Sequence, residues 1–166
     1  MQAILQKDDG SSFFPQAIDQ LLASKQKEAA DLACTIFTKP HGHLSDYTAA
    51  PIIQRLFLAG RQEALDDILA ELGSTNPSGQ TSGEFQGKQV QRQQVTGDAA
   101  AEQLARWRTD KYDYPMLAPD DQRTAERERL KTWLTQQFAL LRQGKKITLR
   151  ITPDPIQVAH WQLDAP

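Results

Sequence analysis

The chain has 166 residues, a formal net charge of −2 and one cysteine, and 24% of its residues are charged. This length is enough to bury the core of a single domain, so we expect one domain over residues 1–166. The near-neutral charge argues against a nucleic-acid binder, which usually carries a basic patch. The sequence shows no apolar run long enough to span a membrane, and the lone Cys34 suits the reducing cytoplasm.

The first half of the chain contains an internal repeat over residues 13–72, with a period of about 35 residues. Leu21 aligns with Leu56, and Glu28 aligns with Glu63. In each copy the apolar spacing predicts a helix, a tight turn and a second helix. Gly60 lies at the second turn, where it can adopt a positive φ. The pattern therefore predicts a pair of stacked helical hairpins.

A long polar segment over residues 73–96 interrupts the helical pattern. Residues 73–83 are rich in Gly, Ser, Thr, Asn and Pro, which predicts an exposed, flexible loop. Residues 84–96 are rich in Gln and leave two alternatives open: an irregular connection, or a short edge hairpin that turns at Gly87. Connections of this length are either disordered or functional.

Helices return over residues 97–144, and a β element follows them. We expect Asp98 to cap the first of these helices and Pro119 to open the longest one, which ends at Gly144. Alternating apolar residues then predict a small β-hairpin over residues 145–163. The predicted fold is mainly α: a two-copy helix-turn-helix repeat, a longer C-terminal helix and this small hairpin.

No pattern in the sequence predicts an enzyme or a cofactor site. The glycine-rich phosphate loops and the GxSxG nucleophile pattern are absent. His41 and His43, with Asp46 nearby, have the only spacing that is typical of metal ligands. Zinc, however, prefers four protein ligands or three with a water. We therefore predict no catalytic residue, no metal and no cofactor.

The candidate partner-binding residues form two groups. Tyr and Met are common anchors in protein interfaces, and the connector before the longest helix supplies Tyr112, Asp113, Tyr114 and Met116. The alternative is that these rings hold the connector to the core. The second group is acidic, and it either faces a basic partner or forms a solvated helix surface; it comprises Glu28, Asp31, Glu63, Asp66 and Asp67.

The repeat over residues 13–72 resembles the helical hairpins of tetratricopeptide-like and HEAT-like repeat proteins, although the signature aromatic and Gly positions of the tetratricopeptide motif are absent. This resemblance implies a scaffold whose grooved surface binds a protein. In size and build the chain is also similar to bacterial immunity proteins, which bind and neutralise a cognate toxin. The alternatives are a secretion chaperone or adaptor, and a small hydrolase. We expect a monomer or small homo-oligomer that binds neither nucleic acid nor a membrane.

Overall fold

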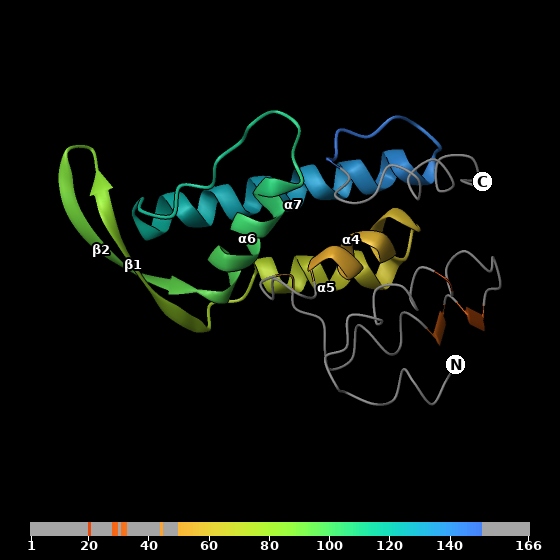
Figure 1. Cartoon of the computed structure of the whole chain (residues 1–166), viewed down its shortest axis with the longest axis horizontal. Coiled ribbons are helices and arrows are strands. Elements are labelled where there is room, and N and C mark those ends of the chain that lie inside the picture. The colour runs from red at the N-terminus through yellow and green to blue at the C-terminus, as the bar shows by residue number, and fades with distance from the viewer. Residues whose placement is uncertain (1–19, 21–27, 30, 33–43, 45–49, 151–166) are drawn as a thin grey trace.

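The computed structural model describes residues 20, 28–29, 31–32, 44 and 50–150. Over residues 50–150, two helices are followed by a β-hairpin and two further helices (Figure 1). The helices are α4 (Ala50–Leu58), α5 (Gln62–Leu72), α6 (Thr96–Arg106) and α7 (Asp120–Arg142), and the strands are β1 (Pro77–Phe85) and β2 (Lys88–Val95).

Helices α4 and α5 form a helical hairpin around a tight turn. Gly60 lies in that turn with a φ of 73°, in the left-handed region that glycine adopts without steric cost. Leu56 of α4 and Leu72 of α5 are fully buried. This helix–turn–helix has the form expected of the second repeat copy. Most of the first copy lies outside the described residues.

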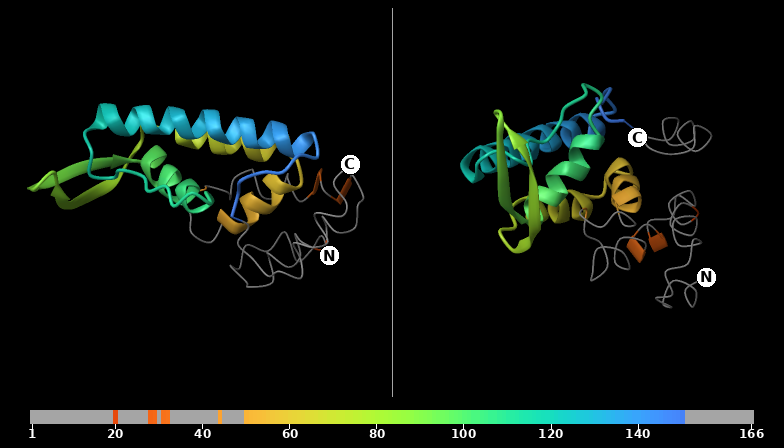
Figure 2. Two further views of the ribbon diagram at one scale, coloured as in Figure 1. Left: turned by 90° about the horizontal axis from the view of Figure 1, so that it is seen from above. Right: turned by 60° about the vertical axis from the view of Figure 1, so that its left-hand side comes forward.

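The long helix α7 runs alongside α5 and completes the core (Figure 2). Leu130, Leu134 and Phe138 are buried, and their four-residue spacing places them on one face of the helix. The ring of Phe57 lies 5.1 Å from that of Phe138 and 6.2 Å from that of Trp107, measured between centroids. These separations are typical of favourable tilted aromatic pairs.

Strands β1 and β2 form a hairpin that extends past the N-terminal end of α7 (Figures 1 and 2). They join through a two-residue turn, in which Gln86 has a φ of 52° and Gly87 a φ of 76°. Positive φ at both positions is typical of the turn whose twist matches that of a hairpin. The strands pair antiparallel from Phe85–Lys88 to Gly79–Gln94, with an irregularity between Pro77 and Gly79.

The fold mixes helices with a β-hairpin between α5 and α6, so the predicted mainly α fold with its small hairpin at residues 145–163 is wrong. The alternative of a hairpin that turns at Gly87 is confirmed, although the strands are longer than expected. Residues 77–83, expected as a flexible loop, belong to a strand, because strand formation depends more on surroundings than on residue type. Residues 145–150 contain no strand, only an isolated bridge between Arg108 and Leu149. Their alternating apolar side chains reflect packing of an extended segment, in which Leu149 is buried. Residues 151–163 lie outside the described part.

Within the described part of the chain, none of the helices combines the length and apolar character that a membrane crossing needs.

Candidate binding surface

The two faces of the β1–β2 hairpin have different surroundings. Side chains alternate along a strand, so Thr81, Gly83 and Phe85 share one face of β1. These three residues are half-buried. Gly83 lies so close to the connector before α7 that an added Cβ would be 2.8 Å from Leu117 Cδ1. At Gly83 this face therefore packs against the connector before α7.

The opposite face of the hairpin, which we call the amide face, is exposed and polar throughout. It consists of Gln80, Ser82, Glu84, Gln89, Gln91 and Gln93. Gln91 Nε2 donates to Gln80 Oε1 at 2.7 Å, and Gln93 Nε2 donates to the Gly79 carbonyl oxygen at 2.7 Å. These bonds order the amides, each of which offers both donors and acceptors. Glu84 is the single charge on this face.

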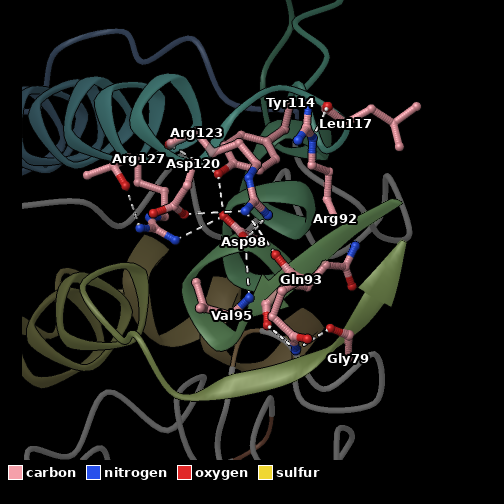
Figure 3. Close-up of polar contacts among 12 residues, drawn as sticks. Gly79, Arg92, Gln93, Val95, Asp98, Tyr114, Leu117, Asp120, Arg123 and Arg127 are labelled. Carbon is pink, nitrogen blue, oxygen red and sulfur yellow. Dashed lines mark hydrogen bonds and ion pairs between the residues drawn. The ribbon is translucent and has the colours of Figure 1, made fainter. Parts of the chain in front are cut away.

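A buried ionic network fixes the base of the hairpin to the helices (Figure 3). Its centre is Asp98, which is 0% exposed and lies in the first turn of α6. Asp98 Oδ2 accepts from Arg123 Nη1 at 2.5 Å, and Oδ1 accepts from Arg127 Nη1 at 2.9 Å. The backbone N–H of Val95, the last residue of β2, donates to Asp98 Oδ2 at 3.1 Å. One carboxylate thus joins β2, α6 and α7.

Two arginines also hold β2 through backbone carbonyl groups. Arg123 Nη2 donates to the Gln93 carbonyl oxygen at 2.9 Å. Arg92 Nε donates to the Leu117 carbonyl oxygen at 3.1 Å, on the connector before α7 (Figure 3). The hairpin is therefore tied to the body by charge-assisted hydrogen bonds, which are stronger than neutral ones.

Tyr114, predicted as a partner-binding residue, is buried in the core and is only 3% exposed. Its hydroxyl donates to Asp98 Oδ1 at 2.7 Å. Burial and this hydrogen bond raise the pKa of the Tyr114 hydroxyl above its usual value. The prediction is corrected for this residue, because its ring and hydroxyl serve the ionic network and are not available to a partner. We call Asp98, Tyr114, Arg123 and Arg127 together the Asp98 network.

The other connector residues also contribute to packing. Tyr112 is half-buried, and its hydroxyl donates to Glu126 Oε2 at 2.9 Å. The Arg108 guanidinium lies 4.4 Å from the centroid of the Tyr112 ring, within the range of a cation–π contact. Met116 is half-buried against the core, whereas Asp113 is exposed.

The predicted acidic residues lie away from the amide face. Asp31 and Glu63 both accept from Arg61 Nη2, at 2.7 Å and 3.0 Å. A backbone hydrogen bond at Glu63 and the nearby Arg61 hold the pKa of the Glu63 carboxyl below its usual value. Glu63 lies near the start of α5, and the hairpin follows the end of that helix. Of the remaining acidic residues, Glu28 and Asp66 are exposed and Asp67 is half-buried.

The sequence predictions did not include the amide face or the ionic network. A signal for the network exists in the spacing of Arg123, Arg127, Leu130 and Leu134, which places two arginines on the apolar stripe of α7. Arginine is usually exposed unless it is paired. Charged residues on an apolar stripe therefore indicate a buried acidic partner. A signal for the amide face is the alternation of Gln89, Gln91 and Gln93.

Among the residues that the structure describes, no three His, Cys, Asp or Glu side chains are grouped so as to hold a metal ion. The residues with metal-like spacing in the sequence, His41, His43 and Asp46, lie outside the described part. Comparison of the chain with protein-family models, curated proteins and solved structures found no match. The amide face itself offers hydrogen bonding by ordered amides.

Proposed function

We propose that this protein binds a protein partner through the amide face of the β1–β2 hairpin and acts by contact, without catalysis. The observation that carries this proposal is the Asp98 network beneath the hairpin. A two-stranded hairpin is marginally stable alone, and removing a charge from water costs several kcal/mol. The buried charges of Asp98, Arg123 and Arg127 hold the hairpin in one position. This costly arrangement is best explained if the exposed face of the hairpin has to be preorganised for binding.

The chemistry of the amide face suits a folded protein surface. Glutamine side chains normally lose conformational freedom when they bind, at a cost of about 0.5–1.5 kcal/mol each. Here Gln80, Gln91 and Gln93 are already ordered by hydrogen bonds within the hairpin. Part of that cost is therefore met before the partner arrives. With Glu84 as its single charge, the face fits a partner patch that is polar and neutral or weakly basic.

In its most specific form, the proposal is that this contact neutralises a cognate toxin or effector in the cytoplasm, as immunity proteins do. A neutralising protein has to bind one partner tightly in one geometry, and a preorganised surface favours such binding. A chaperone for unfolded clients would use an exposed apolar patch, whereas the amide face is polar. A hydrolase would need polar groups converging in a pocket.

The test compares two substitutions of identical chemistry at different places. Gln91→Arg changes the amide face, and Gln136→Arg changes the exposed side of α7. The candidate partner is the product of the neighbouring open reading frame, titrated calorimetrically into each protein. We expect one-to-one binding to the unchanged chain, at least about tenfold weaker binding to Gln91→Arg, equivalent to about 1.4 kcal/mol, and unchanged binding to Gln136→Arg.

Two results would contradict the proposal at different levels. Absence of association with the neighbouring gene product would remove the immunity role. Equal affinity of the Gln91→Arg and Gln136→Arg proteins for a partner that does bind would show that the amide face is not the contact surface.

A further inference from the structure

Among the described residues, no backbone hydrogen bond reaches the outer edge of β1, and the positions of its backbone groups follow from the register. The two-residue turn makes Phe85 and Lys88 a hydrogen-bonded pair, and bonded and non-bonded pairs alternate along an antiparallel ladder. Gln80, Ser82 and Glu84 therefore belong to non-bonded pairs. Their backbone N–H and C=O groups point away from β2, toward the edge of the sheet.

The outer edge of β2 differs, because the helical body covers part of it. The same alternation points the Gln93 carbonyl group away from β1, and there it accepts a hydrogen bond from Arg123. This contact independently supports the assignment of the two edges (Figure 3). β2 also carries Lys88 and Arg92, and charges of this kind discourage strand addition. Along β1 the single charge is Glu84.

We propose that β1 pairs with β1 of a second copy of this chain, antiparallel, about a two-fold axis at Ser82. The regular part of β1 runs from Gly79 to Phe85, beyond the irregularity at its start, and Ser82 is its midpoint. A register centred on Ser82 is therefore the one that pairs the whole regular stretch. The two hairpins together form a four-stranded antiparallel sheet, which is more stable than an isolated ribbon.

The side chains of β1 are complementary to themselves in this register. Glu84 lies opposite Gln80 of the second copy, so each carboxylate faces an amide donor. The two Glu84 carboxylates are offset by about 13 Å along the strands, at 3.3 Å per residue. On the other face Phe85 lies opposite Gly79 of the second copy, where no side chain competes for space. No like charges are opposed, which is the arrangement that stabilises cross-strand pairs.

This inference goes beyond the proposed function. Strand addition uses backbone groups at the edge of a sheet and leaves both faces free. The amide faces of the two copies therefore remain exposed in the dimer and adjoin each other. Binding of a partner and self-association can be measured separately.

The first test places proline on each edge in turn. Ser82→Pro removes an N–H group that the internal ladder does not use, so the hairpin is kept while the edge of β1 can no longer pair. Gln91→Pro makes the same change in the residue directly opposite on β2. By sedimentation equilibrium from micromolar to millimolar concentration, we expect dimers for the unchanged chain and for Gln91→Pro, and a monomer for Ser82→Pro. Circular dichroism verifies folding.

A second test remains informative if proline disturbs the hairpin. Opposed residues of a bonded antiparallel pair have Cα atoms about 5.5 Å apart, within the range of a disulfide. In a Cys34→Ser background, oxidised glutathione is expected to link Ser82→Cys chains into a covalent dimer, itself being reduced. Gln91→Cys chains are expected to stay unlinked.

Several outcomes would overturn the inference. They are a chain that is monomeric at every concentration, equal association of the Ser82→Pro and unchanged chains, and dissociation caused by Gln91→Pro alone. Equal covalent linking of the two cysteine variants would do the same. Because these measurements use the protein alone, none of these results affects the calorimetric test of partner binding.

Discussion

The helical body and the β1–β2 hairpin are held in place by different forces. In the body, Phe57, Leu130 and Leu134 are fully or almost fully buried among apolar neighbours. At the base of the hairpin, two arginines of α7 converge on one carboxylate, that of Asp98. Apolar cores tolerate changes that conserve volume, whereas a buried ionic network is strongly destabilised when one member is removed. The position of the hairpin therefore depends on a few polar atoms.

The largest expected effect on stability is that of Asp98→Asn, which disrupts the ionic network at the base of the hairpin. The substitution keeps the size of the side chain but removes the charge shared by Arg123 and Arg127, which are 3% and 5% exposed. Leaving buried charges unpaired costs about 3–5 kcal/mol, so we expect a loss of that size in the free energy of unfolding in urea.

The matched control for that experiment is Asp120→Asn. Asp120 lies 3.3 Å from Arg123 Nη2 but is 75% exposed, and exposed ion pairs contribute about 0–1 kcal/mol. A loss for Asp98→Asn no larger than the loss for Asp120→Asn would mean that the network does not anchor the hairpin.

The same division between body and hairpin explains what the sequence predicts well. Helix α7 begins directly after Pro119 and ends just before Gly144, as predicted, because proline, glycine and apolar spacing are local signals. Gly87 is also a local signal and marks the turn of the hairpin. The position of the hairpin on the body, however, depends on contacts between distant segments, such as Arg123 with Gln93 and Arg92 with Leu117. Local patterns do not contain such contacts.

For a similar reason, the sequence predicts only part of the candidate site. The sequence predicts Asp98 as the N-cap of α6, but this helix begins at Thr96 and Asp98 lies inside its first turn, where its carboxylate accepts the Val95 N–H. Its two arginine partners lie on another helix, so nothing near Asp98 in the sequence indicates them. Tyr114 was identified as an aromatic anchor, but it anchors the core, because residue type alone does not distinguish an interface from a buried network.

Gly97→Ala tests the junction between the hairpin and the helical body. We expect it to lower the free energy of unfolding by less than Asp98→Asn does. Alanine usually stabilises a helix relative to glycine, by about 1 kcal/mol. Here the added Cβ would lie 2.7 Å from the Leu72 carbonyl oxygen and 2.8 Å from that of Ser74. Both are backbone atoms, so the chain has to shift, and we expect a loss of about 1–3 kcal/mol in urea unfolding.

The reference for ordinary helix propensity is Ala125→Gly on the exposed side of α7, which we expect to cost about 1 kcal/mol. If Gly97→Ala stabilised the protein instead, the close approach of α6 to the end of α5 would be refuted.

Tyr114→Phe removes one hydrogen bond from the Asp98 network, with an expected cost of about 1–2 kcal/mol at neutral pH. It also changes the pH dependence of stability. The folded protein raises the pKa of the Tyr114 hydroxyl, whereas an unfolded tyrosine ionises near pH 10, at about its reference value. The stabilisation is therefore complete below about pH 10 and is lost as the pH rises above it.

Melting temperatures measured from pH 8 upward check this prediction. We expect the unchanged chain to lose stability above about pH 10 more steeply than the Tyr114→Phe variant. Some loss persists in the variant, because the pKa of Tyr112 is raised in the same direction, first by burial and then by Glu126. Parallel curves would show that Tyr114 ionises as easily in the folded as in the unfolded chain.

The smallest effect on stability is expected on the amide face itself. Gln89→Thr and Gln91→Thr replace exposed side chains with a residue that suits a strand, and we expect each to change the free energy of unfolding by less than about 0.5 kcal/mol. The decisive comparison is between these small changes in the free energy of unfolding and the large loss expected for Asp98→Asn. A surface that serves a partner can be altered without unfolding the chain, whereas the network that positions it cannot. Losses from the two threonine variants close to that from Asp98→Asn would mean that the glutamines stabilise the fold and are not reserved for a partner.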